Sequence, residues 1–102
     1  MAIQRIVCFK FKPGTTEPDI QQHMADFAGM KDFIPQILEY RGGLTRPGDY
    51  NSPPGFDTMH YMTFESMDAI DIYFHHEAHQ RFIEHNKAAW ENVLVLNANI
   101  DE

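Results

Sequence analysis

Three of the six histidines and one tyrosine lie within ten residues of one another, in the segment 73–82. Imidazole is the only side chain whose unperturbed pKa lies near neutrality, so a histidine in this segment can exchange a proton at physiological pH. A tyrosine hydroxyl beside it can also donate or hold a proton. When the segment from Ala78 onward is read as a helix, one face carries His79, Phe82, Ile83, Asn86 and Trp90. We therefore expect His79 to point inward.

Tyr73 and His79 are the candidate catalytic residues, as an acid and base pair for an enolisable substrate. Such catalysis needs a group with a suitable pKa within hydrogen-bond reach of the substrate proton, and it contributes about 10²–10⁴-fold in rate. The alternative role of His79 is structural, as a core histidine that donates to a backbone carbonyl and holds its helix in place. The sequence leaves both roles open.

The neighbouring histidines fit a structural role better. His76 precedes a helix that restarts at Glu77, so we expect it to accept from, or pack over, the free N–H groups at the start of that helix. His75, His76 and His79 have a spacing that suits a metal only if the helix is continuous. Because two histidines without a further local ligand make a poor site, we expect no metal and no cofactor.

Length and charge restrict the function classes. With 102 residues, the chain is expected to form one domain over residues 1–102, near the size at which help from a partner is common. Eight Lys and Arg against fifteen Asp and Glu give a net charge of −7, which argues against nucleic acid or an anionic membrane as a partner. Cys8 is the only cysteine, so no intrachain disulfide can form. No apolar stretch approaches the ~18 residues of a membrane span, and we expect a cytoplasmic protein.

Apolar spacing predicts the elements of the first half. Alternation over residues 2–12 predicts a strand that Pro13 and Gly14 end. Thr16 and Asp19 have the spacing of a helix N-cap, and a helical stripe then runs to the break at Pro35. That stripe consists of Ile20, Met24, Phe27 and Ile34. A short strand over 37–44 follows, and the Pro-, Gly- and Asn-rich loop 46–55 is placed to rim a pocket.

The second half is predicted to hold two strands and a broken helix. In a strand over 57–64, one face carries Thr58, His60, Met62 and Phe64, and the other carries Met59, Tyr61 and Thr63. Ser66 caps a short helix, broken near 75–76, whose apolar side carries Met67, Ile70, Tyr73 and Phe74. The last strand, over 91–100, has four consecutive apolar residues at 93–96, which favour a strand covered on both faces.

The order of these elements predicts an α+β, ferredoxin-like β-α-β-β-α-β fold, with an antiparallel sheet and both helical segments on one face. The other face would carry Ile6, Cys8, Leu94 and Leu96. Because a monomer would expose that apolar surface, we predict a two-fold homodimer whose sheets close face to face.

Four segments, at 5–12, 63–66, 76–82 and 93–95, together resemble the stress-responsive dimeric α/β-barrel domain family, in order along essentially the whole chain. The resemblance implies a dimeric barrel with a cavity between sheet and helices in each subunit. Some plant members close linear polyketides by aldol condensation without a metal or organic cofactor. By resemblance to those members, Tyr73 and His79 line the cavity.

The chain departs from the family pattern at three positions. Arg5 stands where a histidine is common, Glu77 replaces the proline of the histidine motif, and Thr58 replaces a histidine that often starts the third strand. His60 lies two residues along on the same strand face as Thr58 and is a partial replacement.

Further residues are candidates for the cavity wall. Arg5 shares strand parity with Val7, so we expect its guanidinium to pair with an acid or an anionic ligand, or else to emerge solvated at the sheet edge. His23 and His85 are expected to be solvated. The candidate substrate-binding residues are Arg5, Val7, Phe9, His60, Phe82 and Trp90.

Three functions are compatible with this pattern. The first is a cofactor-free enzyme of the cyclase, lyase or isomerase type, acting on an oxygenated and partly apolar small molecule. The second is a non-catalytic, stress-associated protein that binds a small ligand. The third is a cofactor-independent monooxygenase, an activity that similar dimeric barrels host.

Overall fold

The structure is a computed structural model that describes residues 2–46 and 55–100. Its strands are β1 (Ala2–Phe11), β2 (Glu39–Leu44), β3 (Thr58–Phe64) and β4 (Trp90–Ile100). Its helices are α1 (Glu17–Gly29), α2 (Met67–His75) and α3 (Glu77–Asn86), with short 3₁₀ turns at Met30–Asp32 and Lys87–Ala89. The strands pair antiparallel in the order β2-β3-β1-β4, which confirms the ferredoxin-like fold. Most of the predicted loop 46–55 lies outside the described residues.

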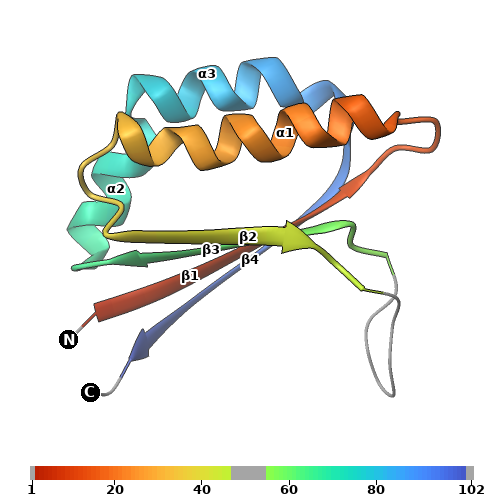
Figure 1. Cartoon of the computed structure of the whole chain (residues 1–102). Helices are drawn as coiled ribbons and strands as arrows, with labels where there is room; N and C mark the ends of the chain where they lie inside the picture. Colours follow the sequence, from red (N-terminus) through yellow and green to blue (C-terminus); the bar gives the residue numbers. More distant parts are fainter. Residues whose placement is uncertain (1, 47–54, 101–102) are drawn as a thin grey trace.

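α1 begins as the sequence predicts. The Thr16 hydroxyl accepts a hydrogen bond from the Asp19 amide, with an Oγ1 to N distance of 3.3 Å. This bond satisfies one of the free N–H groups at the helix start. α1 and α3 run side by side above the sheet (Figure 1). No helix in the described part of the chain is both long and apolar enough to cross a membrane.

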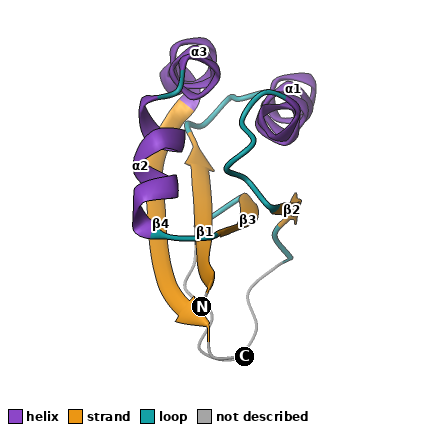
Figure 2. Cartoon of the chain, turned by 90° about the vertical axis from the view of Figure 1, so that its left-hand side faces the viewer, coloured by secondary structure: helices purple, strands orange, loops and turns teal. Residues whose placement is uncertain are grey.

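The break between α2 and α3 is also confirmed. His76 has an extended backbone between the two helices, with φ −63° and ψ 141°. Its Nδ1 accepts from the Ala78 amide at 3.0 Å, so His76 is the N-cap of α3. The break sends α2 down beside one end of the sheet while α3 lies over it (Figures 1 and 2). Tyr73 and His79 therefore come from helices that run in different directions.

The hydrophobic core fills the space between the helices and one side of the sheet, here called the helix face. On β3 the helix face carries the four predicted residues, Thr58, His60, Met62 and Phe64, each fully buried. β1 contributes alternate residues that pair with them across the ladder: Ile3, Arg5, Val7 and Phe9. The predicted face alternation of both strands is confirmed.

Two helix stripes differ from their predictions. On α1 the buried positions are His23 and Phe27, followed by Met30 and Ile34, whereas Ile20 and Met24 are only half-buried. Spacings of four, three and four residues form one helical face, and this face turns toward the sheet. On α2 only two of the four predicted apolar positions, Ile70 and Tyr73, are buried, and Met67 and Phe74 are exposed.

The opposite side of the sheet, here called the open face, carries no helix in the described part of the chain (Figure 1). It includes the other parity of the two central strands and the matching positions of β4: Gln4, Ile6, Cys8, Met59, Tyr61, Leu94 and Leu96. β4 is an edge strand, and its apolar centre is exposed within one chain. The expectation of a strand covered on both faces is therefore not met by the single subunit.

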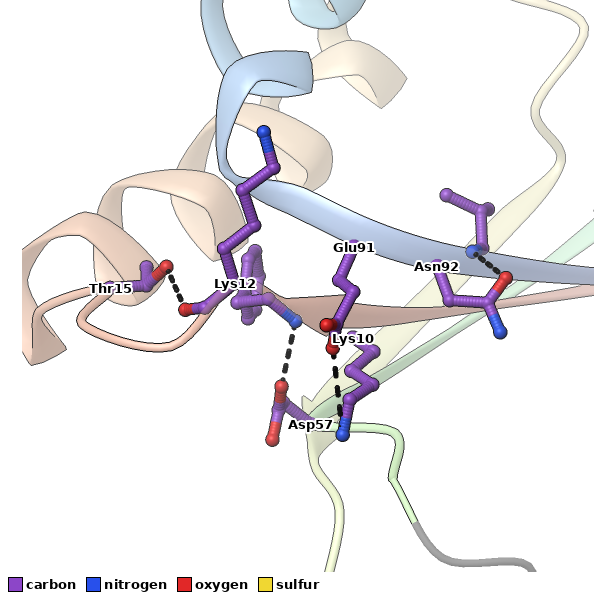
Figure 3. Close-up of polar contacts among 8 residues, drawn as sticks. Lys10, Lys12, Thr15, Asp57, Glu91 and Asn92 are labelled. Atoms are coloured by element: carbon purple, nitrogen blue, oxygen red, sulfur yellow. Dashed lines mark hydrogen bonds and ion pairs between the residues drawn. The ribbon is translucent and has the colours of Figure 1, made fainter.

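Polar contacts fix the end of β1 against its neighbours (Figure 3). The Phe11 amide donates to the Asp57 carboxylate at 2.8 Å, and the Lys10 ammonium lies 3.8 Å from the Glu91 carboxylate. The pairing with β4 shifts register between Lys10 and Phe11, and the Asn92 side chain accepts from the Val93 amide near that point. These contacts hold the strand end on which Phe9 and Phe11 lie.

Candidate functional site

Arg5, Tyr73 and His79 come together at one end of the helix face. The Tyr73 and His79 rings have centroids 4.5 Å apart, and the Arg5 guanidinium carbon lies 5.8 Å from the Tyr73 ring centroid. β1 supplies Arg5, α2 supplies Tyr73 and α3 supplies His79. Three elements that are distant in the sequence thus meet at a cation, a phenol and an imidazole.

His79 is oriented by a backbone carbonyl. Its Nδ1 lies 2.9 Å from the Phe74 carbonyl oxygen, which can only accept, so Nδ1 carries the proton and donates. Nε2 of the neutral ring is then left as a proton acceptor. Burial lowers the pKa of His79, and the Arg5 charge acts in the same direction, while the bond to Phe74 opposes them. The hydrogen bond to the Phe74 carbonyl is the one that a structural role of His79 predicts, and it also fixes the tautomer that a general base requires.

Tyr73 and Arg5 are enclosed to different degrees. Tyr73 is 1% exposed, and burial raises the pKa of its phenol to about 12, with the Arg5 charge acting in the opposite direction. Arg5 is half-buried and donates from Nη1 to the Asn97 side-chain oxygen at 3.2 Å. Its Nε is buried without a hydrogen-bond partner, and Arg5 forms no ion pair with an acid among the described residues. The guanidinium is thus held by an amide rather than by the acid considered from the sequence.

The remaining predicted site residues do not join this cluster. Val7 lies in the core, one pair along β1 from Arg5 on the same face. Phe9, His60, Phe82 and Trp90 instead surround a second buried polar group, His23. His23 itself is not a predicted site residue, and the expectation that it is solvated is wrong, since it is 1% exposed. His85 is exposed, as predicted.

His23 belongs to a hydrogen-bonded chain of three side chains. The Nε2 atoms of His23 and His60 are 2.9 Å apart, and the His60 Nδ1 lies 2.8 Å from the Tyr40 hydroxyl. Phe27 stacks on the His60 ring with centroids 3.7 Å apart and planes inclined by 5°. Burial lowers the pKa of His23 to about 4, with Asp26 acting against it, and burial and His23 together lower the pKa of His60 to about 3. Both rings are therefore neutral at pH 7.

Two cavities of similar size open on different sides of the molecule. One, of about 450 Å³, lies between α1 and α3 and includes His23, Asp26 and His85 in its wall. The other, of about 440 Å³, lies on the open face against β2 and β3 and is lined by Arg41, Met59 and Tyr61 among others. Among the described residues, no three His, Cys, Asp or Glu side chains converge in a way that would hold a metal ion.

Residues 3–100 match the family model described as the stress-responsive A/B barrel domain. The chain belongs to this family. The resemblance read from the segments at 5–12, 63–66, 76–82 and 93–95 is thereby confirmed.

Several known proteins resemble this A/B barrel chain along nearly its whole length. Olivetolic acid cyclase from Cannabis sativa is 26% identical over 99 residues, covering 95% of each chain. The structure of hydroxynitrile lyase from Passiflora edulis is similar with a TM-score of 0.87 at 24% identity, covering 99% of this chain and 94% of the lyase. A dimeric ferredoxin-like protein of unknown function from Thermobifida fusca has a TM-score of 0.83 at 15% identity, covering 98% and 92% of the two chains. The structural likenesses show the shared fold.

The sequence of this A/B barrel protein led us to propose Tyr73 and His79 as site residues, but not His23 or Tyr40. The first pair lies in a recognisable motif, whereas the second pair lies on elements read only for their apolar residues. The signal for His23 was its spacing of four residues from Phe27, on the buried face of α1. The signal for Tyr40 was its strand parity with Gly42, which pairs with His60.

Proposed function

We propose that this A/B barrel protein is a homodimeric, cofactor-free enzyme that performs acid–base chemistry on a small, oxygenated and partly apolar substrate. The observation that carries the proposal is the meeting of Arg5, Tyr73 and His79, with the two rings 4.5 Å apart and the guanidinium over the phenol. The cyclase and the lyase among its relatives support chemistry of this class.

His79 acts as the general base in this proposal. The Phe74 carbonyl holds the Nδ1 proton, so Nε2 can remove a proton from a carbon next to a substrate carbonyl. Since burial lowers its pKa, the imidazole is neutral and able to accept a proton at pH 7. The proton that leaves the carbon goes to Nε2, and the electron pair goes to the carbonyl oxygen as an enolate.

Tyr73 and Arg5 stabilise that developing oxyanion. The high pKa of Tyr73, about 12, keeps its hydroxyl protonated, so it can donate a hydrogen bond to the substrate oxygen. The Arg5 Nε is a buried donor without a partner, and a donor in that state gains most from an anionic oxygen. The resulting enolate can then attack a second carbonyl, as in a cyclisation, or be reprotonated.

The open face of the sheet supports the homodimer in this proposal. The open face carries apolar side chains on three strands, including Ile6, Met59 and Leu96, and a monomer would leave them against water. Ferredoxin-like neighbours from Thermobifida fusca and Jannaschia are described as dimeric. A second copy placed on this face would cover β4 and enclose the cavity against β2 and β3.

The proposal is tested by proton exchange. Acetophenone incubated with the wild-type protein in deuterated buffer should gain deuterium at its methyl group faster than in buffer alone, as followed by proton NMR. The variant His79→Gln should lose this acceleration, a loss of about 10²–10⁴-fold if His79 is the base. Tyr73→Phe should lower the rate while leaving exchange measurable.

A matched control is His75→Gln, because His75 is exposed on α2 and only four residues from His79. It should exchange at the wild-type rate. Circular dichroism shows whether each variant is folded. A folded His79→Gln protein that exchanges at the wild-type rate would refute the assignment of the base.

A second candidate function is binding without chemistry. Tyr73 is 1% exposed and His79 is 8% exposed, an enclosure that suits a tightly held or purely structural pair. In that case acetophenone would bind, as seen in ligand-detected NMR, with no exchange above the buffer rate. The monooxygenase considered from the sequence is separated by oxygen uptake with a hydroquinone, which an acid–base enzyme does not consume.

A further inference from the structure

The protons in the hydrogen-bonded chain of side chains from Tyr40 through His60 to His23 can be counted. Both imidazoles are neutral, so each carries one N–H. The two Nε2 atoms are 2.9 Å apart, and a hydrogen bond between them needs one N–H and one lone pair. One ring must therefore be protonated on Nε2 and the other on Nδ1.

Two arrangements satisfy this rule. In the first, Tyr40 donates to the His60 Nδ1, the His60 Nε2 donates to the His23 Nε2, and the His23 Nδ1 carries a proton. In the second, every bond is reversed, and the His23 Nδ1 carries a lone pair. In both, the chain ends at the His23 Nδ1, which is buried without a hydrogen-bond partner. A buried polar atom in that state is destabilising unless something satisfies it.

His23 forms part of the wall of the cavity between α1 and α3, which has a volume of about 450 Å³. This volume is large enough for a small organic molecule. Most of its described lining residues are polar, including the two carboxylates Asp19 and Asp26, and none of them is a lysine or arginine. Its apolar part consists of Phe11, Ala88 and Ala89. Both Asp26 oxygens already accept hydrogen bonds, from Gln22 and Asn86.

We propose that the cavity over His23 is a binding site for a small neutral molecule that bears a hydroxyl group, with the hydroxyl bonded to the His23 Nδ1. A hydroxyl both donates and accepts, so it satisfies Nδ1 in either proton arrangement. The two carboxylates disfavour an anionic ligand, and the apolar part of the wall, at Phe11, Ala88 and Ala89, suits a small hydrocarbon or aromatic portion. Tyr40 and His60 act as positioning residues, because they set whether the His23 Nδ1 donates or accepts the hydrogen bond.

This site is separate from the proposed catalytic cluster. Tyr73 and His79 lie at the other end of the helix face, beside Arg5, and are not part of this cavity wall. The inference therefore does not depend on the proposed function, and failure of either leaves the other standing.

The test is a titration of ¹⁵N-histidine-labelled wild-type protein with benzyl alcohol, followed by the ring nitrogen shifts. The His23 Nδ1 signal should move in a saturable way, while the signals of the exposed His75 stay fixed in the same spectra. Toluene, which lacks the hydroxyl, should leave the His23 Nδ1 shift unchanged. Benzoate, which has the same ring and a negative charge, should bind about tenfold or more weakly. An unchanged Nδ1 signal with benzyl alcohol, or equal binding of benzoate, would overturn the proposal.

Variants provide a second test that does not depend on the His23 signal. His23→Phe should weaken benzyl alcohol binding about fivefold to tenfold, measured on the amide signals of Ala88 and Ala89, whereas His75→Phe should not. Tyr40→Phe should change the tautomer of His60, as read from its two ring nitrogen shifts, and should alter the affinity of the folded protein. If His23→Phe does not fold, the wild-type titration alone decides the question. Unchanged affinity in folded His23→Phe would exclude the proposed bond.

Discussion

Gly42 lies directly opposite His60 in the β2–β3 ladder, and the Tyr40 side chain occupies the space that a side chain at position 42 would need. A Cβ at this position would overlap the Tyr40 hydroxyl, and it would lie 2.9 Å from the Tyr40 Cζ and 3.1 Å from the His60 Nδ1. The glycine is thus required by the close approach of Tyr40 to His60. One missing side chain on β2 permits the hydrogen bond that begins the chain to His23.

Gly42→Ala should break the bond between Tyr40 and His60. The added methyl group displaces the tyrosine ring and leaves the buried His60 Nδ1 without a partner, so we expect a loss of about 1–3 kcal/mol in the free energy of unfolding. Gly43→Ala is the matched control, because a Cβ at Gly43 meets nothing within 4 Å. Urea denaturation measures the free energy of unfolding of both variants. Equal stability of the two variants would show that Tyr40 does not need this space.

Acid should destabilise the protein through His23 and His60. Their folded-state pKa values are lowered to about 4 and about 3, against an ordinary value of 6.5. The unfolded chain therefore binds protons at a higher pH than the folded protein does. Their contribution to stability is fully present well above pH 6.5 and is lost as the pH drops toward 3, by on the order of 4 kcal/mol for the two groups together between pH 7 and pH 5.

Four charged or titratable groups lie near this pair: Asp19 and Asp26 on α1, Tyr40 on β2 and His85 on α3. Asp26 partly offsets the effect, because it raises the pKa of His23. Urea unfolding at a series of pH values measures how steeply the free energy of unfolding changes with pH. The double variant His23→Phe, His60→Leu should flatten this dependence, and an unchanged slope in that variant would assign the acid sensitivity to other groups.

The fold could be predicted because its signals are local and periodic. The alternation of β1 and β3, the Thr16 cap and the break at His76 each depend on a few neighbouring residues. The buried face of α1 was harder to predict, because His23 is polar and a search for apolar residues at helical spacing does not include it. Exposure of β4 could not be judged from its four apolar residues, since composition does not tell whether the chain itself or a second copy covers a strand.

The candidate site was predictable only where a motif marked it. Tyr73 and His79 were proposed in that way, and the structure places their ring centroids 4.5 Å apart. Their catalytic role stays a prediction. The substrate-binding role predicted for His60 stays a prediction, and its partners could not be foreseen. Tyr40, His60 and His23 come from three elements, and their contact depends on the space left at Gly42, which no local pattern encodes.

His76→Ala should destabilise α3. Its Nδ1 accepts from the Ala78 amide at 3.0 Å, and its removal leaves that N–H without a side-chain partner, which costs about 1 kcal/mol for a typical N-cap. His75→Ala is the matched control, because His75 is exposed and lies in the last turn of α2. Thermal unfolding should separate the two variants. An equal effect of both would show that the cap contributes nothing to stability.

Leu96→Glu should convert the proposed dimer into a monomer. Leu96 is 56% exposed within one chain and pairs with Ile6 on the open face, where the proposed second copy packs. A carboxylate there would be buried without a partner in the dimer and solvated in the monomer, so dissociation is favoured. Ile72→Glu is the matched control, because Ile72 is 50% exposed but lies on α2, away from that face. Light scattering at micromolar concentration should report a dimer for the wild type and Ile72→Glu and a monomer for Leu96→Glu. A wild-type monomer, or a Leu96→Glu dimer, would refute association through this face.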